Sequence, residues 1–306
     1  MQNVHKYAAL GWLAAVILLS EPGIAAADHR HMSPGWGPAV PEQGVNTTDF
    51  AEGCPIETPD GLSLLIASNR SGLGFNDIWA ADRASIDEPF GEPRKLESPI
   101  SYDTSSEFCP SPTYGRSLLF VSTRADGCGG GDIYYTRQSP AGGWSKPVNL
   151  GCAPLGPNTV DTEYSPSVVE TWYGTFLFYS TSGGTGNNDI YVSVLGNDGH
   201  FGPGSVVASL SSPYEDFMPN VRARDGGGFE VVFNSDRPFW GPKGQPAQGG
   251  QDVYTSSTWW LPGFWSSPTN LGPNVNTGAS ETRATLSGDG NRLHFGRSGD
   301  IYVSER

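Results

Sequence analysis

The chain has 306 residues, among them 41 glycines, 25 prolines and 9 tryptophans, and only 16% of its residues are charged. This composition suits many short strands joined by tight turns and disfavours long helices. The formal net charge of −14 argues against a nucleic acid or an anionic membrane surface as a partner, but leaves cations, basic proteins and neutral sugars open.

The N-terminal segment has the pattern of a secretory signal peptide. Lys6 precedes an apolar run over residues 7–19, and small residues follow at 25–27, so cleavage is expected before Asp28. The apolar run is too short to span a bilayer, and no second long run follows. We therefore expect a signal peptide at 1–27, a flexible tail at 28–35, and an exported, periplasmic or extracellular protein that does not span a membrane.

One short phrase occurs five times along the chain, with successive copies 48 to 63 residues apart: Asp77-Ile78-Trp79, Asp132-Ile133-Tyr134, Asp189-Ile190-Tyr191, Asp252-Val253-Tyr254 and Asp300-Ile301-Tyr302. A repeat of this period indicates a solenoid, a propeller or an array.

Each copy has the same companions in the same order. An acidic residue comes first, then a turn signal, an apolar β-rich run, a serine-rich phrase such as Ser122-Thr123-Arg124, a glycine-rich loop, and the Asp-Ile-Tyr phrase. A fourth strand is visible at 144–151 and again at 265–272. Four short antiparallel strands per repeat are typical of a propeller blade.

The last repeat ends at Arg306, directly after its third strand. The missing fourth strand resembles the segment at 36–47, because Trp36 to Val40 matches the beginning of the strand at 265–272. Closing the ring in this way removes two free sheet edges. The predicted fold is all-β, a five-bladed β-propeller of four-stranded antiparallel blades forming a single domain at 36–306, with the closing strand at 36–47.

These phrases, together with Trp144-Ser145-Lys146-Pro147-Val148-Asn149-Leu150-Gly151, resemble the WD40-like propeller repeat of the TolB type. The resemblance covers nearly all of the expected mature chain and implies an exported binding protein. TolB itself resembles a six-bladed ring with an extra N-terminal domain. Because this chain has five repeats and no such domain, the TolB partners are not carried over.

The repeat places one acidic residue at the start of each first strand: Glu52, Glu107, Glu163, Asp216 and Glu281. Such a ring of carboxylates at one mouth of the channel could bind a cation such as calcium, or a polar ligand. The favoured hypothesis is structural, with each acid accepting hydrogen bonds from the backbone of the neighbouring blade. Arg283 is expected either to enter the channel as a counter-ion or to be solvated.

Four cysteines in an exported chain predict two disulfides. Cys54 and Cys109 occupy equivalent positions on adjacent blades, and Cys128 and Cys152 are expected on one face of a single blade. Of the three pairings, Cys54 with Cys109 and Cys128 with Cys152 is preferred. No Cys-x-x-Cys pair occurs and histidines are few, so no metal centre of the zinc type is predicted.

Two groups of aromatic residues stand outside the repeat phrases. Phe239 and Trp240 lie in the longest loop, 238–250, where they could stack on a sugar, anchor a protein partner or pack the loop down. Trp259, Trp260, Phe264 and Trp265 precede a fourth strand and are interpreted mostly as blade packing.

Two functions remain. The leading hypothesis is a non-enzymatic, monomeric binding module without a cofactor, which holds a protein or glycan partner on its loop face. The alternative is an inverting glycoside hydrolase of the arabinanase or xylosidase type, using Glu52, Glu107 and Glu163. Against it, the acids follow the repeat, whereas catalysis needs two carboxyls in different environments.

Overall fold

The computed structural model describes residues 35–183, 187–238 and 247–306. The predicted signal peptide, nearly all of the tail, and the loop residues Phe239 and Trp240 lie outside the described residues. Within the described ranges every regular element is a β-strand, and none of them forms a helix long and apolar enough to cross a membrane.

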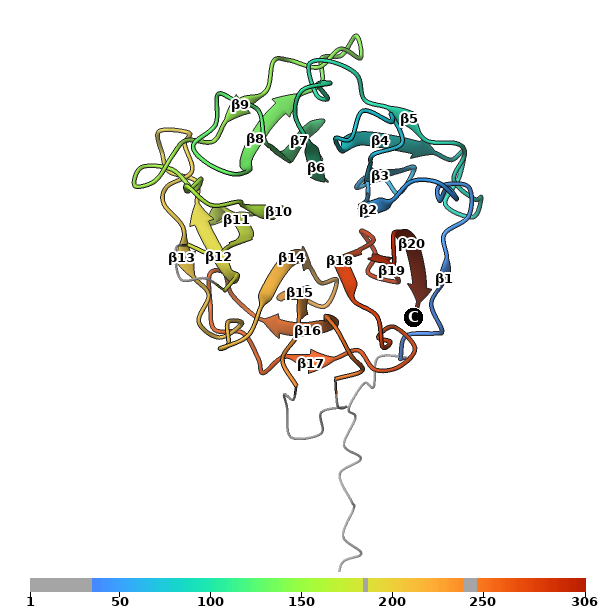
Figure 1. Cartoon of the computed structure of the whole chain (residues 1–306). Helices are drawn as coiled ribbons and strands as arrows, with labels where there is room; N and C mark the ends of the chain where they lie inside the picture. Colours follow the sequence, from blue (N-terminus) through green and yellow to red (C-terminus); the bar gives the residue numbers. More distant parts are fainter. Residues whose placement is uncertain (1–34, 184–186, 239–246) are drawn as a thin grey trace, which may run out of the picture. The chain divides into compact units, whose positions relative to one another are not determined.

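In these ranges twenty strands form five four-stranded antiparallel sheets arranged in a ring, so the predicted five-bladed β-propeller is confirmed (Figure 1). From the channel outward, the blades are β2 (Glu52–Glu57), β3 (Ser63–Ser68), β4 (Asp77–Asp82) and β5 (Arg94–Lys95); β6 (Glu107–Pro112), β7 (Ser117–Ser122), β8 (Asp132–Arg137) and β9 (Val148–Asn149); β10 (Tyr164–Thr171), β11 (Gly174–Thr181), β12 (Asp189–Val194) and β13 (Ser205–Val206); β14 (Asp216–Ala223), β15 (Phe229–Ser235), β16 (Asp252–Thr258) and β17 (Thr269–Asn270); and β18 (Glu281–Leu286), β19 (Arg292–Arg297), β20 (Asp300–Glu305) and β1 (Val40–Pro41).

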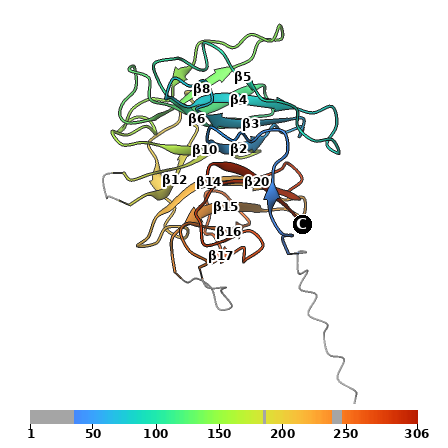
Figure 2. The same ribbon diagram turned by 45° about the vertical axis from the view of Figure 1, so that its right-hand side comes forward.

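The ring is closed by the N-terminal segment, as the sequence predicts. Val40 pairs with Val303, and the Gly37 amide donates to the Glu305 carbonyl at 2.8 Å. Figures 1 and 2 both show β1 (blue) beside β20 (red). The Trp36 ring is buried in the core of this last blade, under the Arg306 guanidinium.

The apolar run of each repeat forms the second strand of its blade, which is buried on both faces. All six residues of β7 are buried, because neighbouring blades cover both faces of the sheet. Its sequence, Ser-Leu-Leu-Phe-Val-Ser, accordingly shows no alternation between apolar and polar residues. The cores therefore lie between blades, where residues of adjacent sheets such as Phe178 and Phe233 pack in one cluster.

A backbone hydrogen bond joins each blade to the one before it. The amide of the acidic residue that opens each first strand donates to the carbonyl just before the preceding Asp-Ile-Tyr phrase, as from Glu107 to Asn76 at 2.7 Å. The equivalent bond from Glu52 to Gly299 joins the first repeat to the last. The repeated acid and the repeated Asp-Ile-Tyr phrase thus meet at every blade junction.

Candidate functional site

The five repeat carboxylates lie at the start of the inner strands, and all are buried. Hydroxyl groups of their own blade and of the connection before the strand bind them. Glu107 accepts from Ser105 Oγ at 2.6 Å and from Ser122 Oγ at 2.7 Å. Glu52 accepts from Ser68 Oγ at 3.0 Å. Backbone amides of the connection that leads from the preceding blade also donate to these carboxylates, as from Tyr102 to Glu107 Oε2 and from Thr47 to Glu52 Oε2, both at 3.0 Å.

Four of the five carboxylates also form an ion pair with an arginine of the second strand or of the loop after it. The pairs are Arg70 with Glu52, Arg124 with Glu107, Arg237 with Asp216, and Arg297 with Glu281. Each guanidinium also donates to a carbonyl in the connection before the inner strand, at Val45, Ile100, Leu210 and Val275. A buried carboxylate that pairs with a guanidinium and several donors is stabilised in its ionised form.

The third blade departs from this pattern. Thr181 pairs with the aspartate of its Asp-Ile-Tyr phrase as Ser122 does in the second blade, so Gly183 occupies the position of Arg124. The Tyr179 hydroxyl donates to the Pro157 carbonyl at 3.0 Å instead. Tyr179 therefore takes over the structural bond of the arginine without supplying its charge. Among the described residues, no arginine or lysine forms an ion pair with Glu163.

Glu163 consequently lies in an electrostatic environment that differs from that of the four arginine-paired carboxylates. Its Oε1 accepts from the Thr159 amide at 2.9 Å and from Thr159 Oγ1 at 2.6 Å, while its Oε2 has no hydrogen-bond partner among the described residues. Burial raises the pKa of Glu163 to about 7, and the Thr159 hydrogen bonds only partly oppose this. Burial also raises the pKa of Glu281, where Thr277 and Arg297 counteract the shift.

A second buried carboxyl, Asp132, adds negative charge near Glu163 and raises its pKa further. Asp132 accepts from the Cys128 amide at 2.6 Å, and burial raises its own pKa. The Cys128–Cys152 disulfide, with a Cα–Cα distance of 5.6 Å, links the loop that holds Asp132 to the end of the same blade.

Two residues after each acid, the inner strand contains a β-bulge whose residue has a positive φ: Cys54, Cys109, Ser165, Met218 and Arg283. Cys54 and Cys109 form the second disulfide, with a Cα–Cα distance of 4.8 Å, so both predicted pairings are present. Ser165 Oγ donates to Cys109 Sγ at 3.4 Å.

Arg283 is fully buried, and its Nη2 reaches from the fifth blade to the Pro110 carbonyl of the second blade at 3.2 Å. These blades are not neighbours, so the side chain crosses the channel. Its Nε and Nη1 have no partner among the described residues, and burial lowers the pKa of Arg283 to about 9. Of the two expectations for Arg283, solvation is wrong, and no described carboxylate of the ring forms an ion pair with it.

A guanidinium inside the channel raises the electrostatic cost of placing a cation nearby. Among the described residues, no three histidine, cysteine, aspartate or glutamate side chains gather as a metal site would require. The calcium suggested by the carboxylate ring stays an untested prediction.

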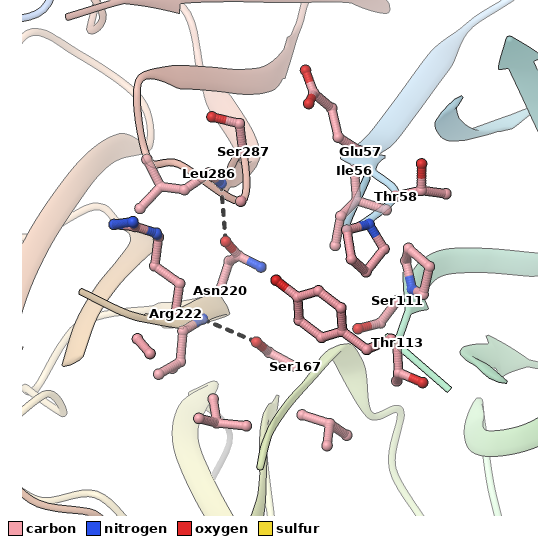
Figure 3. Close-up of a pocket in the computed structure, with 18 of the residues that line it drawn as sticks. Ile56, Glu57, Thr58, Ser111, Thr113, Ser167, Asn220, Arg222, Leu286 and Ser287 are labelled. Atoms are coloured by element: carbon pink, nitrogen blue, oxygen red, sulfur yellow. Dashed lines mark hydrogen bonds between the residues drawn. The ribbon is translucent and has the colours of Figure 1, made fainter. Parts of the chain in front are cut away.

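The opposite mouth of the channel holds a cavity of about 220 Å³ that sequence reasoning missed. The ends of the inner strands and the hairpin turns after them line it. Asn220 and Ser167 stand in this mouth, where they accept from the Leu286 and Val221 amides at 2.9 Å (Figure 3). The sequence of this region, such as Pro59-Asp60-Gly61, predicts only hairpin turns.

The aromatic residues before the fourth strand of the fourth blade divide into two kinds. Trp265 is buried and packs on Phe178, which confirms blade packing for this residue. For Trp259, Trp260 and Phe264 the interpretation is wrong, because these side chains are 69%, 63% and 86% exposed. Of these four side chains only Trp265 enters the core, and the three that precede it in the chain lie outside the core.

Comparisons with known proteins give a fold but no family. No protein-family model matches the chain, and no curated protein matches it in sequence. Among solved structures, the catalytic domain of the Coprinopsis cinerea GH62 α-L-arabinofuranosidase superposes with a TM-score of 0.57 at 13% identity, covering 89% of this chain and 96% of that one.

Two further structures superpose similarly. The α-L-arabinofuranosidase of Podospora anserina, determined in complex with cellotriose, has a TM-score of 0.56 at 11% identity over 89% of this chain and 96% of that chain. The endo-arabinase of Bacteroides thetaiotaomicron has a TM-score of 0.55 at 14% identity, over 86% and 96%.

These neighbours correct the leading functional hypothesis, a non-enzymatic module that binds a protein or glycan partner. The similar propellers are named as glycoside hydrolases, and they therefore favour the alternative hypothesis over the leading one. The argument from repeat symmetry also fails on the structure, since Glu163 does not share the environment of Glu52 and Glu107. Nothing among these neighbours bears on the TolB-type resemblance, which stays a prediction.

Proposed function

We propose that this protein is a glycoside hydrolase that acts on a neutral glycan, with Glu163 as proton donor. The observation that carries the proposal is the environment of Glu163, where burial raises the pKa to about 7 and no arginine of the described residues forms the ion pair found at Glu52 and Glu107. A glycoside hydrolase needs one carboxyl that holds its proton near neutral pH and another that is ionised.

Glu107 is the best candidate for the second carboxyl, the general base. It occupies the equivalent position on the adjacent blade, and the Arg124 guanidinium lies 3.3 Å from its Oε1. In an inverting reaction Glu107 would take a proton from the attacking water, and Glu163 would give its proton to the glycosidic oxygen as the C–O bond breaks. Glu52, the third residue of the alternative hypothesis, has the same kind of arginine pair.

The burial of both carboxyls sets a condition on this reaction. Glu107 and Glu163 are both closed to solvent in this structure. A glycan can contact them only if the connections that carry Ser105 and Thr159 move aside when it binds. The proposal therefore includes a rearrangement of these connections on substrate binding.

The fold neighbours guide the choice of substrate. Similar structures act on arabinofuranosyl linkages, as their names state. The net charge of −14 favours a neutral glycan over an anionic one. The two disulfides fit an oxidising compartment, so we place the substrate outside the cytoplasm.

The test compares hydrolysis of arabinan and of an aryl α-L-arabinofuranoside with a highly acidic phenol as leaving group. Glu163→Gln should lower the rate on arabinan by about 10²- to 10⁴-fold but retain more activity on the aryl substrate, whose leaving group needs little protonation. Glu107→Gln should lose activity on both substrates, because the attacking water loses its base.

Glu281→Gln provides the matched control, since it neutralises a buried repeat carboxyl on the fifth blade that has no assigned role. Its activity per folded molecule should equal that of the wild type. If Glu163→Gln and Glu281→Gln behave alike, or if the wild type hydrolyses nothing on a broad panel of neutral glycans, the proposal is wrong.

A further inference from the structure

An exposed aromatic groove lies between the third and fourth blades, at the channel end opposite the carboxylates. It measures about 390 Å³ and is lined by Trp172 and Tyr173 on the β10–β11 turn and by Trp259 and Trp260 after β16. Trp172 is 89% exposed, and Trp259 and Trp260 are mostly exposed as well. Exposed aromatic side chains gathered in one groove usually mark an interaction site.

The rings are held in place before any ligand arrives. The Tyr173 ring contacts Trp172 at 5.2 Å and Trp260 at 5.9 Å between centroids, and its hydroxyl accepts from the Leu261 amide at 3.0 Å. Tyr173 thereby fixes two tryptophans from different blades in one arrangement. Trp259 packs over the turn at Gly228, which has a φ of +75°. A Cβ atom at this position would lie only 3.3 Å from the Trp259 ring, so glycine allows the close contact.

The groove lies next to the polar cavity at the channel mouth. Glu170 and Ala223 line both spaces, so these two residues stand between the channel mouth and the aromatic rings. Glu170 is exposed at this junction, and Thr171 follows it along the groove. The two adjacent spaces together offer ring faces in the groove, and carboxylate, hydroxyl and amide groups toward the channel mouth.

We propose that this groove binds a stretch of neutral polysaccharide, with sugar C–H faces stacked on the tryptophans and hydroxyls bonded at Glu170 and in the channel-mouth cavity. The ligand class rests on the proposed glycan-directed function. A sugar chain has apolar faces, which match the aromatic rings, and hydroxyl edges, which match the polar groups of the lining. The net charge of −14 disfavours an anionic membrane or a nucleic acid here.

The test measures retention on insoluble arabinan, xylan and cellulose in a Glu163→Gln background, so that binding is observed without hydrolysis. Trp172→Ala combined with Trp260→Ala should weaken retention at least tenfold. Phe264→Ala is the matched control, because Phe264 is equally exposed on the same connection but does not line the groove. Its retention should equal that of the parent, and thermal unfolding checks that each variant is folded.

The two proposals fail in different ways. If the parent binds no polysaccharide, or if the double variant and Phe264→Ala bind equally, the groove proposal is overturned even when hydrolysis of soluble glycans is observed. If retention depends on the tryptophans while no glycan is hydrolysed, the groove stands and the hydrolase proposal fails. Loss of a protein partner in the double variant, with glycan retention unchanged, would also overturn the groove proposal.

Discussion

A single substitution in a repeated phrase distinguishes Glu163 from the other repeat carboxyls. Arg124 of the second blade corresponds to Gly183 of the third by strand pairing, and the lack of an arginine at 180–183 was visible in the sequence. The effect on Glu163 could not be predicted from the sequence, because the Tyr179 hydroxyl, from another position of the strand, makes the same bond to the preceding connection. Only the folded structure shows that the bond is replaced while the charge is lost.

The raised pKa of Glu163 predicts a pH-dependent stability. Below about pH 4.5 this carboxyl is protonated in both states; between pH 4.5 and 7 the folded state keeps a proton that the unfolded chain releases. Its contribution to stability is therefore lost as the pH rises through about 7. Glu163→Gln should gain stability relative to the wild type from pH 4.5 to 7.5, by up to about 3 kcal/mol.

Denaturant unfolding of both proteins at several pH values measures this difference. Titrating groups distant from Glu163 contribute equally to both curves, so the difference reports Glu163 together with its electrostatic coupling to Asp132. A constant difference between the two proteins across this range would show that Glu163 is ionised in the folded state like an ordinary glutamate.

Arg283 illustrates what residue type alone leaves open. The sequence placed it at the channel position shared with Cys54 and Met218, but could not decide between the channel and solvent. The bulge, with its positive φ, aims this side chain across the channel to Pro110. The long-range geometry of five strands meeting at one axis determines its burial.

At the scale of elements, the strands were predictable because each repeat carries the same turn signals and apolar run. The register of Asp-Ile-Tyr against the second strand is also the same in each blade, as in Asp132 with Ser122. The fourth strands are shorter than the phrases at 144–151 and 265–272 suggest, because only two residues of each pair with the third strand. Proline and exposed loops occupy the rest of these segments.

Ring closure by the N-terminal strand predicts a strong effect of its removal. Trp36→Ala should destabilise the protein by about 3–5 kcal/mol, because it empties a buried site between the last blade and its neighbour. Val40→Ala, on the same strand but with an exposed side chain, should change stability by less than about 0.5 kcal/mol.

Deleting residues 36–41 should additionally expose the edge of β20 and cause association that depends on protein concentration. Thermal denaturation and sedimentation measure the two effects. A deletion variant that melts like the full chain and stays monomeric would contradict closure by this segment.

At the scale of the whole molecule, five-fold repetition made the fold predictable and concealed the function. The repeat predicts equivalent roles for equivalent residues, so it indicates the carboxylates at one mouth and gives no signal for the hairpin ends at the other. Yet the cavity and the aromatic groove lie at those hairpin ends, where Trp172 and Trp260 meet from different blades. Such a meeting depends on the arrangement of blades, which no single repeat encodes.

The most direct test of the account is a carbon-13 NMR titration of the glutamate side-chain carboxyls in the wild type and in Glu163→Gln. The account predicts a carboxyl signal that titrates near pH 7 in the wild type and is missing from the variant. A wild-type spectrum in which the signal lost on substitution titrates near pH 4.5 would contradict a protonated Glu163 and, with it, the proposed proton donor.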